Sequence, residues 1–406
     1  MSPTTTDYHT DAASGTNLGG QDLQDVMNGA AFLSVGGGGP RNFGQKLLDA
    51  LDGKSVSVVA ASQVPDDAWV VCSAYLGSPD AAQALKHPTF NSLKRSIEAL
   101  QKSSGITVDY VVPGEMGAVN TVAPFLAASD MGVPLIDADG CGRAVPILAA
   151  TSFGGDSLLI PRHGAAVAND ADDLDNYQSA VFSAGNIEQI QIAAGVVLGS
   201  PAYGKLGAVA LWLMTGAELK KLAVVGGVSR AQAVGKALRE AQAGGGDPLA
   251  ALQQTLTAVG MPNRVLFNGS TLNATGVKVA TRDIHDHGTL TFQVTDNPGE
   301  VATVYTFNEN ILMYSNRQTS PVLLSPDMLG WMRADGSTLD NSELQARYEQ
   351  GDLGELYAIG IEAVQPIGVP GLPDRTPFRD APNIRAAMTK ILGMAGYSGE
   401  YTHFKA

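Results

Sequence analysis

The sequence predicts two domains, an N-terminal α/β domain with a largely parallel sheet and a C-terminal β-rich α+β domain. The 406 residues are enough for two domains of ordinary size. In the first half, apolar runs of strand length alternate with segments of helical spacing, a pattern typical of α/β proteins. From Arg264 onward, strand-like runs with alternating side chains and frequent turn residues dominate, which favours a β-rich domain with few helices.

Four segments divide the chain. Residues 1–20 are polar and lack the basic and apolar regions of a signal peptide, so we expect a disordered leader there. The α/β domain is predicted over residues 21–185 and the β-rich domain over residues 186–378. Residues 379–406 form a C-terminal tail, in which 383–392 suit one more helix.

The elements of the first domain follow from the spacing of apolar residues and from the turn residues between them. Residues 88–102 suit a helix, because apolar residues recur there at three- and four-residue intervals from Phe90 to Leu100. The other predicted helices cover residues 23–33, 44–51 and 121–129, and the predicted strands cover residues 56–60, 69–74, 109–112 and 133–136.

The rest of the chain begins with helices and ends with strands. Residues 165–176 are acidic and predict a loop, and 186–198 suit a helix or a buried apolar segment. Ser229 suits the N-cap of a helix that runs to Ala243. Further helices are predicted at residues 217–221 and 248–259, and strands at 208–213, 264–268, 276–282, 290–296, 301–307, 311–314 and 358–364.

The composition excludes several classes of protein. Charged residues are 16% of the chain and apolar residues 44%, whereas a disordered chain combines high charge with low hydrophobicity. The net charge of −14 argues against nucleic-acid and membrane partners, and no apolar stretch is long enough for a transmembrane helix. Two cysteines are too few for a disulfide framework, so we expect a cytoplasmic protein. The composition is also compatible with a homo-oligomer.

Glycine is in excess, with 47 residues in 406, where an average chain has roughly 7%. Part of the excess falls in loops that carry polar or charged side chains. Ligands of α/β sheets gather at the carboxyl ends of the strands. The candidate site is therefore expected in the segments that follow predicted strands, namely 73–79, 113–120 and 137–146.

The segment IDADGCGRAVP, from Ile136 to Pro146, is the densest of these. Asp137 and Asp139 lie two residues apart, so in extended backbone they face the same side. Such a pair would bind a metal or supply a general acid or base, and Arg143 would clamp a substrate carboxylate. The alternative is an aspartate turn with a structural Asp–Arg pair.

The segment GEMGAVN, from Gly114 to Asn120, also follows a predicted strand. Glu115 suits an acid, a base or a metal ligand, and Asn120 suits a group that orients a carbonyl. Alternatively, Asn120 caps the helix that follows it.

The run GGGGP at 36–40 lacks the lysine and hydroxyl of a P-loop and the spacing of a dinucleotide fingerprint, so no nucleotide cofactor is expected. The backbone N–H groups of Gly37, Gly38 and Gly39 would still be available to hold an oxyanion or a substrate carbonyl.

Other candidates are scattered along the chain. His285 and His287 form an H-x-H pair that suits a divalent metal such as zinc, or else a surface turn. Cys141 would be a nucleophile if its pKa were lowered, but a small buried residue is the favoured interpretation. Asn310 belongs to the polar group NEN between two apolar runs, which would reach a domain cleft or simply form a turn.

Taken in order, these segments resemble the S-methyl thiohydantoin desulfurase family. The main matches are GGGGP at 36–40, GEMGAVN at 114–120 and DADGCGRAVP at 137–146. Shorter matches are LGSP at 76–79, AGNI at 184–187, NEN at 308–310 and SPD at 325–327. The resemblance implies an N-terminal α/β domain, a more β-rich C-terminal domain and a hydrolase that converts an S-methyl thiohydantoin to a hydantoin and methanethiol.

The expected reaction is attack of an activated water on a ring carbon of a small nitrogen heterocycle, with Asp137, Asp139 or Glu115 as the base. One alternative is a metal-dependent amidohydrolase or lyase acting on a cyclic amide or imide. Another is a non-catalytic partner or sensor of a hydantoinase-type enzyme, which would bind the ring without turning it over.

Overall fold

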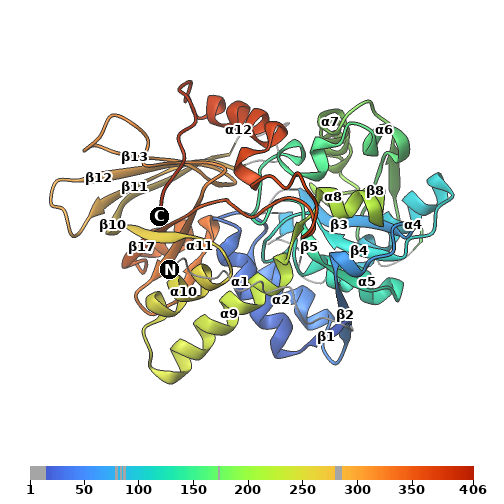
Figure 1. Cartoon of the computed structure of the whole chain (residues 1–406), viewed down its shortest axis with the longest axis horizontal. Helices are drawn as coiled ribbons and strands as arrows, with labels where there is room; N and C mark the ends of the chain where they lie inside the picture. The colour runs from blue at the N-terminus through green and yellow to red at the C-terminus, as the bar shows by residue number, and fades with distance from the viewer. Residues whose placement is uncertain (1–14, 78–80, 83–84, 86–87, 172–173, 279–285) are drawn as a thin grey trace.

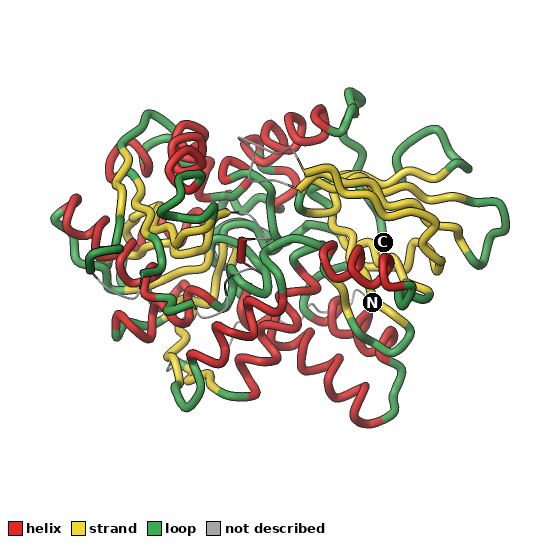
Figure 2. Tube along the Cα trace, turned by 180° about the vertical axis from the view of Figure 1, so that it is seen from behind, coloured by secondary structure: helices red, strands yellow, loops and turns green. Residues whose placement is uncertain are grey.

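The computed structural model describes residues 15–77, 81–82, 85, 88–171, 174–278 and 286–406. They form two lobes, each built on its own β-sheet. Figures 1 and 2 show the two sheets at opposite ends of the molecule, with helices packed around and between them. The first sheet is mixed and the second is antiparallel, which confirms the predicted fold class.

The first sheet has the strand order β1-β2-β5-β4-β3-β8-β6-β7, and β9 pairs with β5. The central strands β2, β5, β4 and β3 run parallel, and the strands that flank them are antiparallel. The strands are β1 (Thr16–Gly19), β2 (Ser55–Ala60), β3 (Trp69–Gly77), β4 (Tyr110–Pro113), β5 (Leu135–Asp139), β6 (Ala165–Ala168), β7 (Ser179–Phe182), β8 (Leu206–Thr215) and β9 (Val224–Val225).

The second sheet has the order β14-β13-β12-β11-β10-β17-β15-β16, with antiparallel pairing throughout its described strands. Its strands are β10 (Asn263–Lys278), β11 (Asp286–Val294), β12 (Val301–Phe307), β13 (Glu309–Ser315), β14 (Leu323–Leu324), β15 (Met328–Arg333), β16 (Thr338–Leu339) and β17 (Glu355–Ile361).

The helices cover the sheets and fill the space between the lobes. They are α1 (Gln21–Leu33), α2 (Arg41–Ala50), α4 (Asn91–Ser104), α5 (Ala123–Met131), α6 (Leu159–His163), α7 (Ile187–Leu198), α8 (Gly216–Leu222), α9 (Gly227–Gly244), α10 (Pro248–Ala258), α11 (Asn341–Gln350) and α12 (Pro382–Met394). In the described part of the chain, none of them combines the length and the apolar character that crossing a bilayer needs.

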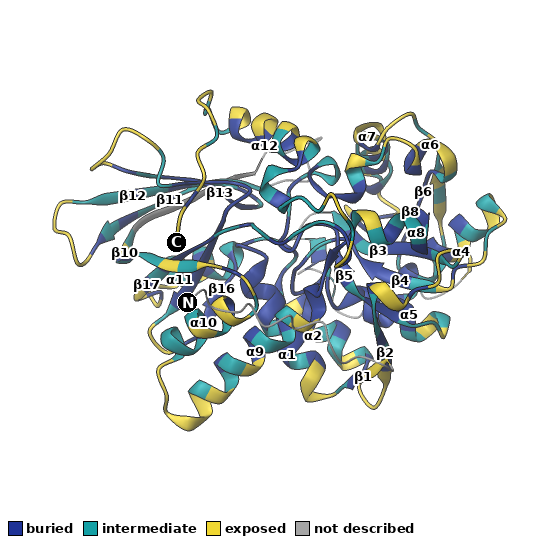
Figure 3. Ribbon diagram, viewed as in Figure 1, coloured by how far each residue is buried: buried dark blue, intermediate teal, exposed yellow. Residues whose placement is uncertain are grey.

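Helix α1 packs against both lobes. It crosses α9 at a pair of glycines, where a Cβ on Gly29 would lie 1.8 Å from the carbonyl oxygen of Ala231. On its other side, Phe32 fills the space above Gly330 of β15. One buried apolar cluster therefore runs from the first lobe into the second, and Figure 3 shows buried residues continuing between the two sheets.

Three predicted boundaries need correction. Residues 16–19 of the predicted leader form β1, which pairs with β2, while residues 1–14 lie outside the described residues. The start of the predicted acidic loop forms β6. The sheets do not divide at residue 185, because β8 lies between β3 and β6 of the first sheet. Strand β8 joins the first sheet by pairing with residues far away in the sequence. Local composition, on which the predicted boundary was based, does not report such pairing.

Candidate active site

A cavity of about 180 Å³ lies between the lobes, at the carboxyl ends of β3 and β4. That volume holds several waters or one small ring. The first lobe contributes Tyr75, Glu115 and Trp212 to the wall, and the second lobe contributes His287 and Glu309. The cavity thus forms where the predicted strand-end segments meet the β11–β13 region of the second sheet.

Glu115 lines this cavity directly after β4. Its Oε1 accepts a hydrogen bond of 2.8 Å from Asn120 Nδ2, and its Oε2 accepts one of 2.9 Å from the Val145 backbone N–H. Burial raises the pKa of Glu115 to about 7 despite these two hydrogen bonds, and the negative charge of Asp139 adds to the rise. A carboxyl with this pKa suits a general base at neutral pH.

Asn120 also lines the cavity and fixes Glu115 in place. Its Oδ1 accepts a hydrogen bond of 2.9 Å from the Tyr75 backbone N–H. The alternative that Asn120 caps the next helix is wrong, since α5 begins at Ala123 and its N-cap residue Val122 offers no side-chain hydrogen bond. The side chain instead connects β3 to the Glu115 carboxyl.

Glu309, at the start of β13, is the second carboxyl that lines the cavity. It is 2% exposed, and its Oε2 has no hydrogen-bond partner among the described residues. Burial and the negative charge of Glu115 raise its pKa well above the usual range. Sequence reasoning placed it only within the polar group NEN. The preceding Asn308 turns the chain between β12 and β13 with φ of +57°, a conformation that Asn readily adopts.

The glycine loop lies between the lobes and lines the cavity. The Gly37 N–H donates to the Ser34 carbonyl oxygen at 3.2 Å, and the Gly38 N–H donates to the Glu309 carboxyl. These two N–H groups are therefore engaged inside the protein, which corrects the expectation that they hold a substrate oxyanion. Gly39, with φ of +87°, completes the loop against Val119.

Asp137 and Asp139 do not line the cavity. They face the N-terminus of α9, where Asp137 Oδ1 accepts a hydrogen bond of 3.0 Å from the Ser229 N–H and Gly227 lies against Asp139 Oδ2. Asp139 Oδ1 accepts from the backbone N–H groups of Cys141 and Gly142. Burial raises the pKa of Asp139 to about 6. The structure thus brings Glu115 to the cavity and leaves both aspartates behind its wall.

Arg143 is fully buried and does not line the cavity. Its Nη1 donates to the carbonyl oxygens of Pro326 at 2.6 Å and Asp327 at 3.2 Å, and to Ser325 Oγ at 3.3 Å. The proposed clamp on a substrate carboxylate is therefore corrected: the guanidinium ties the loop after β5 to the second lobe.

Asn310 is buried beside the glycine loop and does not line the cavity. Its N–H donates to the Val35 carbonyl oxygen and its Nδ2 to the Leu329 carbonyl oxygen, each at 2.8 Å. This side chain fixes the loop position, which corrects its expected contact with substrate.

The H-x-H pair is only partly described. His285 lies outside the described residues, whereas His287 lines the cavity with its ring 4.4 Å from that of Phe307. Across the described ranges, no three or more His, Cys, Asp and Glu side chains gather in a way that would hold a metal ion.

Both cysteines are buried as thiols. Cys72 lines the cavity, and the Cys141 Sγ donates to the Arg143 carbonyl oxygen at 2.9 Å. Burial raises the pKa of each thiol well above its usual range, because a thiolate would be desolvated there. Neither side chain has the lowered pKa of a cysteine nucleophile.

Three comparisons place this geometry among known proteins. A crystal structure of a protein from Chromobacterium violaceum matches with a TM-score of 0.77 and 22% identity, over 96% of this chain and 99% of that one, which shows a shared fold. The comparison with curated proteins gives no match. The S-Me-THD-like N-terminal domain matches residues 21–166, and the S-Me-THD-like C-terminal domain matches residues 193–350. The chain therefore belongs to the S-methyl thiohydantoin desulfurase-like family.

Proposed function

We propose that this protein hydrolyses a small nitrogen heterocycle of the S-methyl thiohydantoin type, with Glu115 as the general base. The observation that carries the proposal is the position of Glu115. Its carboxyl lines a small cavity, is held by two hydrogen bonds and has a pKa of about 7. Membership of the family supports the choice of ring.

The chemistry begins with a water bound beside Glu115. The carboxylate removes a proton as the water oxygen attacks the ring carbon that carries the methylthio group. Loss of the C–S bond then gives methanethiol, and the ring is left as a hydantoin with a new C=O bond. A base of pKa near 7 suits this step, because it is half ionised at neutral pH and still basic enough to accept the proton.

The wall of the cavity favours an uncharged ring over an anionic one. Its apolar part includes Phe43, Tyr75 and Trp212, which suit the faces of a flat heterocycle. Its acidic part includes Glu115, Glu309 and Asp340, and no Lys or Arg occurs among the described residues that line it. A substrate carboxylate would find no cationic partner among these described residues.

The test is release of methanethiol from S-methyl thiohydantoin, followed with a thiol reagent, by the wild type and by Glu115→Gln. Loss of the base is expected to lower kcat by about 10²- to 10⁴-fold. Glu98→Gln, on the exposed face of α4, is the control for the same chemical change. Release at the wild-type rate by Glu115→Gln would contradict the assignment of the base.

A further inference from the structure

We propose that Glu309 is a second catalytic carboxyl, the general acid that protonates the ring nitrogen when water adds to the ring carbon. The inference rests on the proposed function and extends it to a residue of the second lobe. Its basis is the position of the Glu309 carboxyl in the cavity and its relation to Glu115 and Arg143.

The carboxyl of Glu309 is held at the cavity wall by the glycine loop. A Cβ on Gly37 would lie 1.9 Å from Glu309 Oε1, so only glycine leaves room for this carboxyl. The Gly38 N–H donates to it. The other oxygen, Oε2, is buried and has no hydrogen-bond partner within the described part of the chain. A buried carboxyl oxygen without a partner, on a residue that lines a cavity, is suited to bond a ligand that binds there.

The charges around Glu309 favour its protonated form. Burial and the negative charge of Glu115 raise its pKa, while the positive charge of Arg143 and the hydrogen bonds of its own and the Gly38 N–H act in the opposite direction. The net pKa lies well above the usual range, whereas Glu115 has a pKa of about 7. Near neutral pH, one carboxyl is thus a proton donor and the other a proton acceptor, the division of roles that an acid–base pair needs.

The proton transfers balance with these two groups alone. Glu115 takes a proton from water as the oxygen bonds to carbon, and the electron pair of the ring C=N bond moves to nitrogen, which takes the Glu309 proton. The Glu309 carboxylate then accepts the remaining hydroxyl proton as the C=O bond forms. The C–S bond breaks, and Glu115 returns its proton to the methanethiolate. One proton of the water ends on sulfur and the other replaces the proton that Glu309 gave to nitrogen, so both carboxyls regain their starting state.

The experiment compares Glu309→Gln with the wild type on S-methyl thiohydantoin. Glutamine keeps the shape and the neutral charge but has no acidic proton, so kcat is expected to fall at least 100-fold while KM changes less than threefold. The alkaline limb of the wild-type kcat profile, which reports ionisation of Glu309, is expected to be absent from the residual activity. Glu355→Gln, an exposed glutamate of the same lobe, is the control.

Three outcomes are distinguishable. If the wild type releases methanethiol and Glu309→Gln keeps more than one-hundredth of its kcat, the role of Glu309 is overturned and the proposed function stands. If the wild type releases no methanethiol, the proposed function itself fails. Binding of hydantoin, measured by calorimetry, confirms that Glu309→Gln is folded. Should that variant not fold, Gly37→Ala displaces the same carboxyl and is expected to show the same fall in kcat.

Discussion

The ionisation of Glu115 is the residue-scale property with the clearest kinetic consequence. Because the base must be unprotonated, kcat/KM is expected to rise with pH through about 7, the pKa of this carboxyl. Asp139 contributes to that value through its negative charge. Replacing it with Asn removes the charge but keeps an oxygen for the Cys141 and Gly142 N–H groups. Asp139→Asn is therefore expected to move the acid limb to lower pH, by about half a pH unit.

The measurement is kcat/KM between pH 5 and 9 for the wild type, Asp139→Asn and Asp137→Asn. Asp137 lies on the same strand and carries the same charge, but its carboxyl bonds to Ser229 at the start of α9. The Asp137→Asn substitution is expected to leave the acid limb of the kcat/KM profile at the wild-type pH. An acid limb that stays in place in Asp139→Asn would show that this aspartate does not act on the base.

At this scale the sequence predicted part of the site. Glu115 and Asn120 follow a strand in one short segment, so their meeting at the strand end could be expected from local order. Glu309 reaches the same cavity from the other lobe, and nothing near it in the sequence reports that approach. The contacts of Arg143 could not be predicted either, because only the packing of the lobes brings residues 325–327 to it.

The glycine loop between α1 and α2 sets the geometry at the scale of elements. Gly38 has φ of +70°, and a Cβ there would lie 2.5 Å from the Cα of Gly117, in the loop that carries Glu115. Gly38→Ala must therefore push two backbone segments apart, and we expect it to destabilise the protein by about 1–3 kcal/mol and to lower activity. Urea unfolding and methanethiol release are the two measurements.

Gly53 offers a matched control for this substitution. It has φ of +71°, but a Cβ there would meet nothing within 4 Å. Gly53→Ala thus carries the same backbone strain without the collision, and it is expected to cost about 1 kcal/mol and leave activity unchanged. Equal effects of the two substitutions would mean that backbone strain alone, and not the contact with the Glu115 loop, explains the requirement for glycine.

The bounds of an element were predictable where the segment has its own apolar spacing. They were not predictable where pairing with a distant strand sets them. The apolar spacing of residues 88–102 predicted α4 to within three residues. Strand β1 was hidden in a polar segment, because Leu18 is its one apolar side chain and pairing with β2 holds the rest. The predicted tail contains the expected helix α12, yet its last residues are bound to the second lobe.

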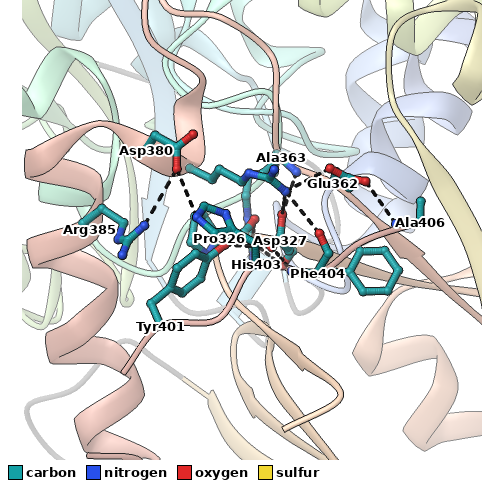
Figure 4. Close-up of polar contacts among 12 residues, drawn as sticks. Pro326, Asp327, Glu362, Ala363, Asp380, Arg385, Tyr401, His403, Phe404 and Ala406 are labelled. Carbon is teal, nitrogen blue, oxygen red and sulfur yellow. Dashed lines mark hydrogen bonds and ion pairs between the residues drawn. The ribbon is translucent and has the colours of Figure 1, made fainter. Parts of the chain in front are cut away.

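Across the whole molecule, Asp327 connects the chain end to both lobes. Its fully buried carboxylate accepts hydrogen bonds from the Tyr401 hydroxyl at 2.7 Å and from the Phe404 N–H at 2.9 Å, as Figure 4 shows. It also pairs with Arg379 at 3.4 Å. Its backbone oxygen accepts from Arg143 of the first lobe. The C-terminal residues are therefore part of the packing that holds the lobes against each other around the cavity.

Removing this carboxylate is expected to weaken the whole assembly. Asp327→Ala leaves the Tyr401 hydroxyl and the N–H groups of Phe404 and Ala363 without their acceptor. Arg379 keeps its pair with Glu362 at 3.0 Å. We expect a loss of about 3–5 kcal/mol from the three orphaned donors together. Asp380 belongs to the same polar cluster, but its side chain is 35% exposed and its pair with Arg385 spans 3.7 Å. Asp380→Ala should cost less than about 1 kcal/mol. Urea unfolding of both variants measures the two losses, and equal losses would mean that the buried carboxylate of Asp327 does not stabilise the C-terminal residues.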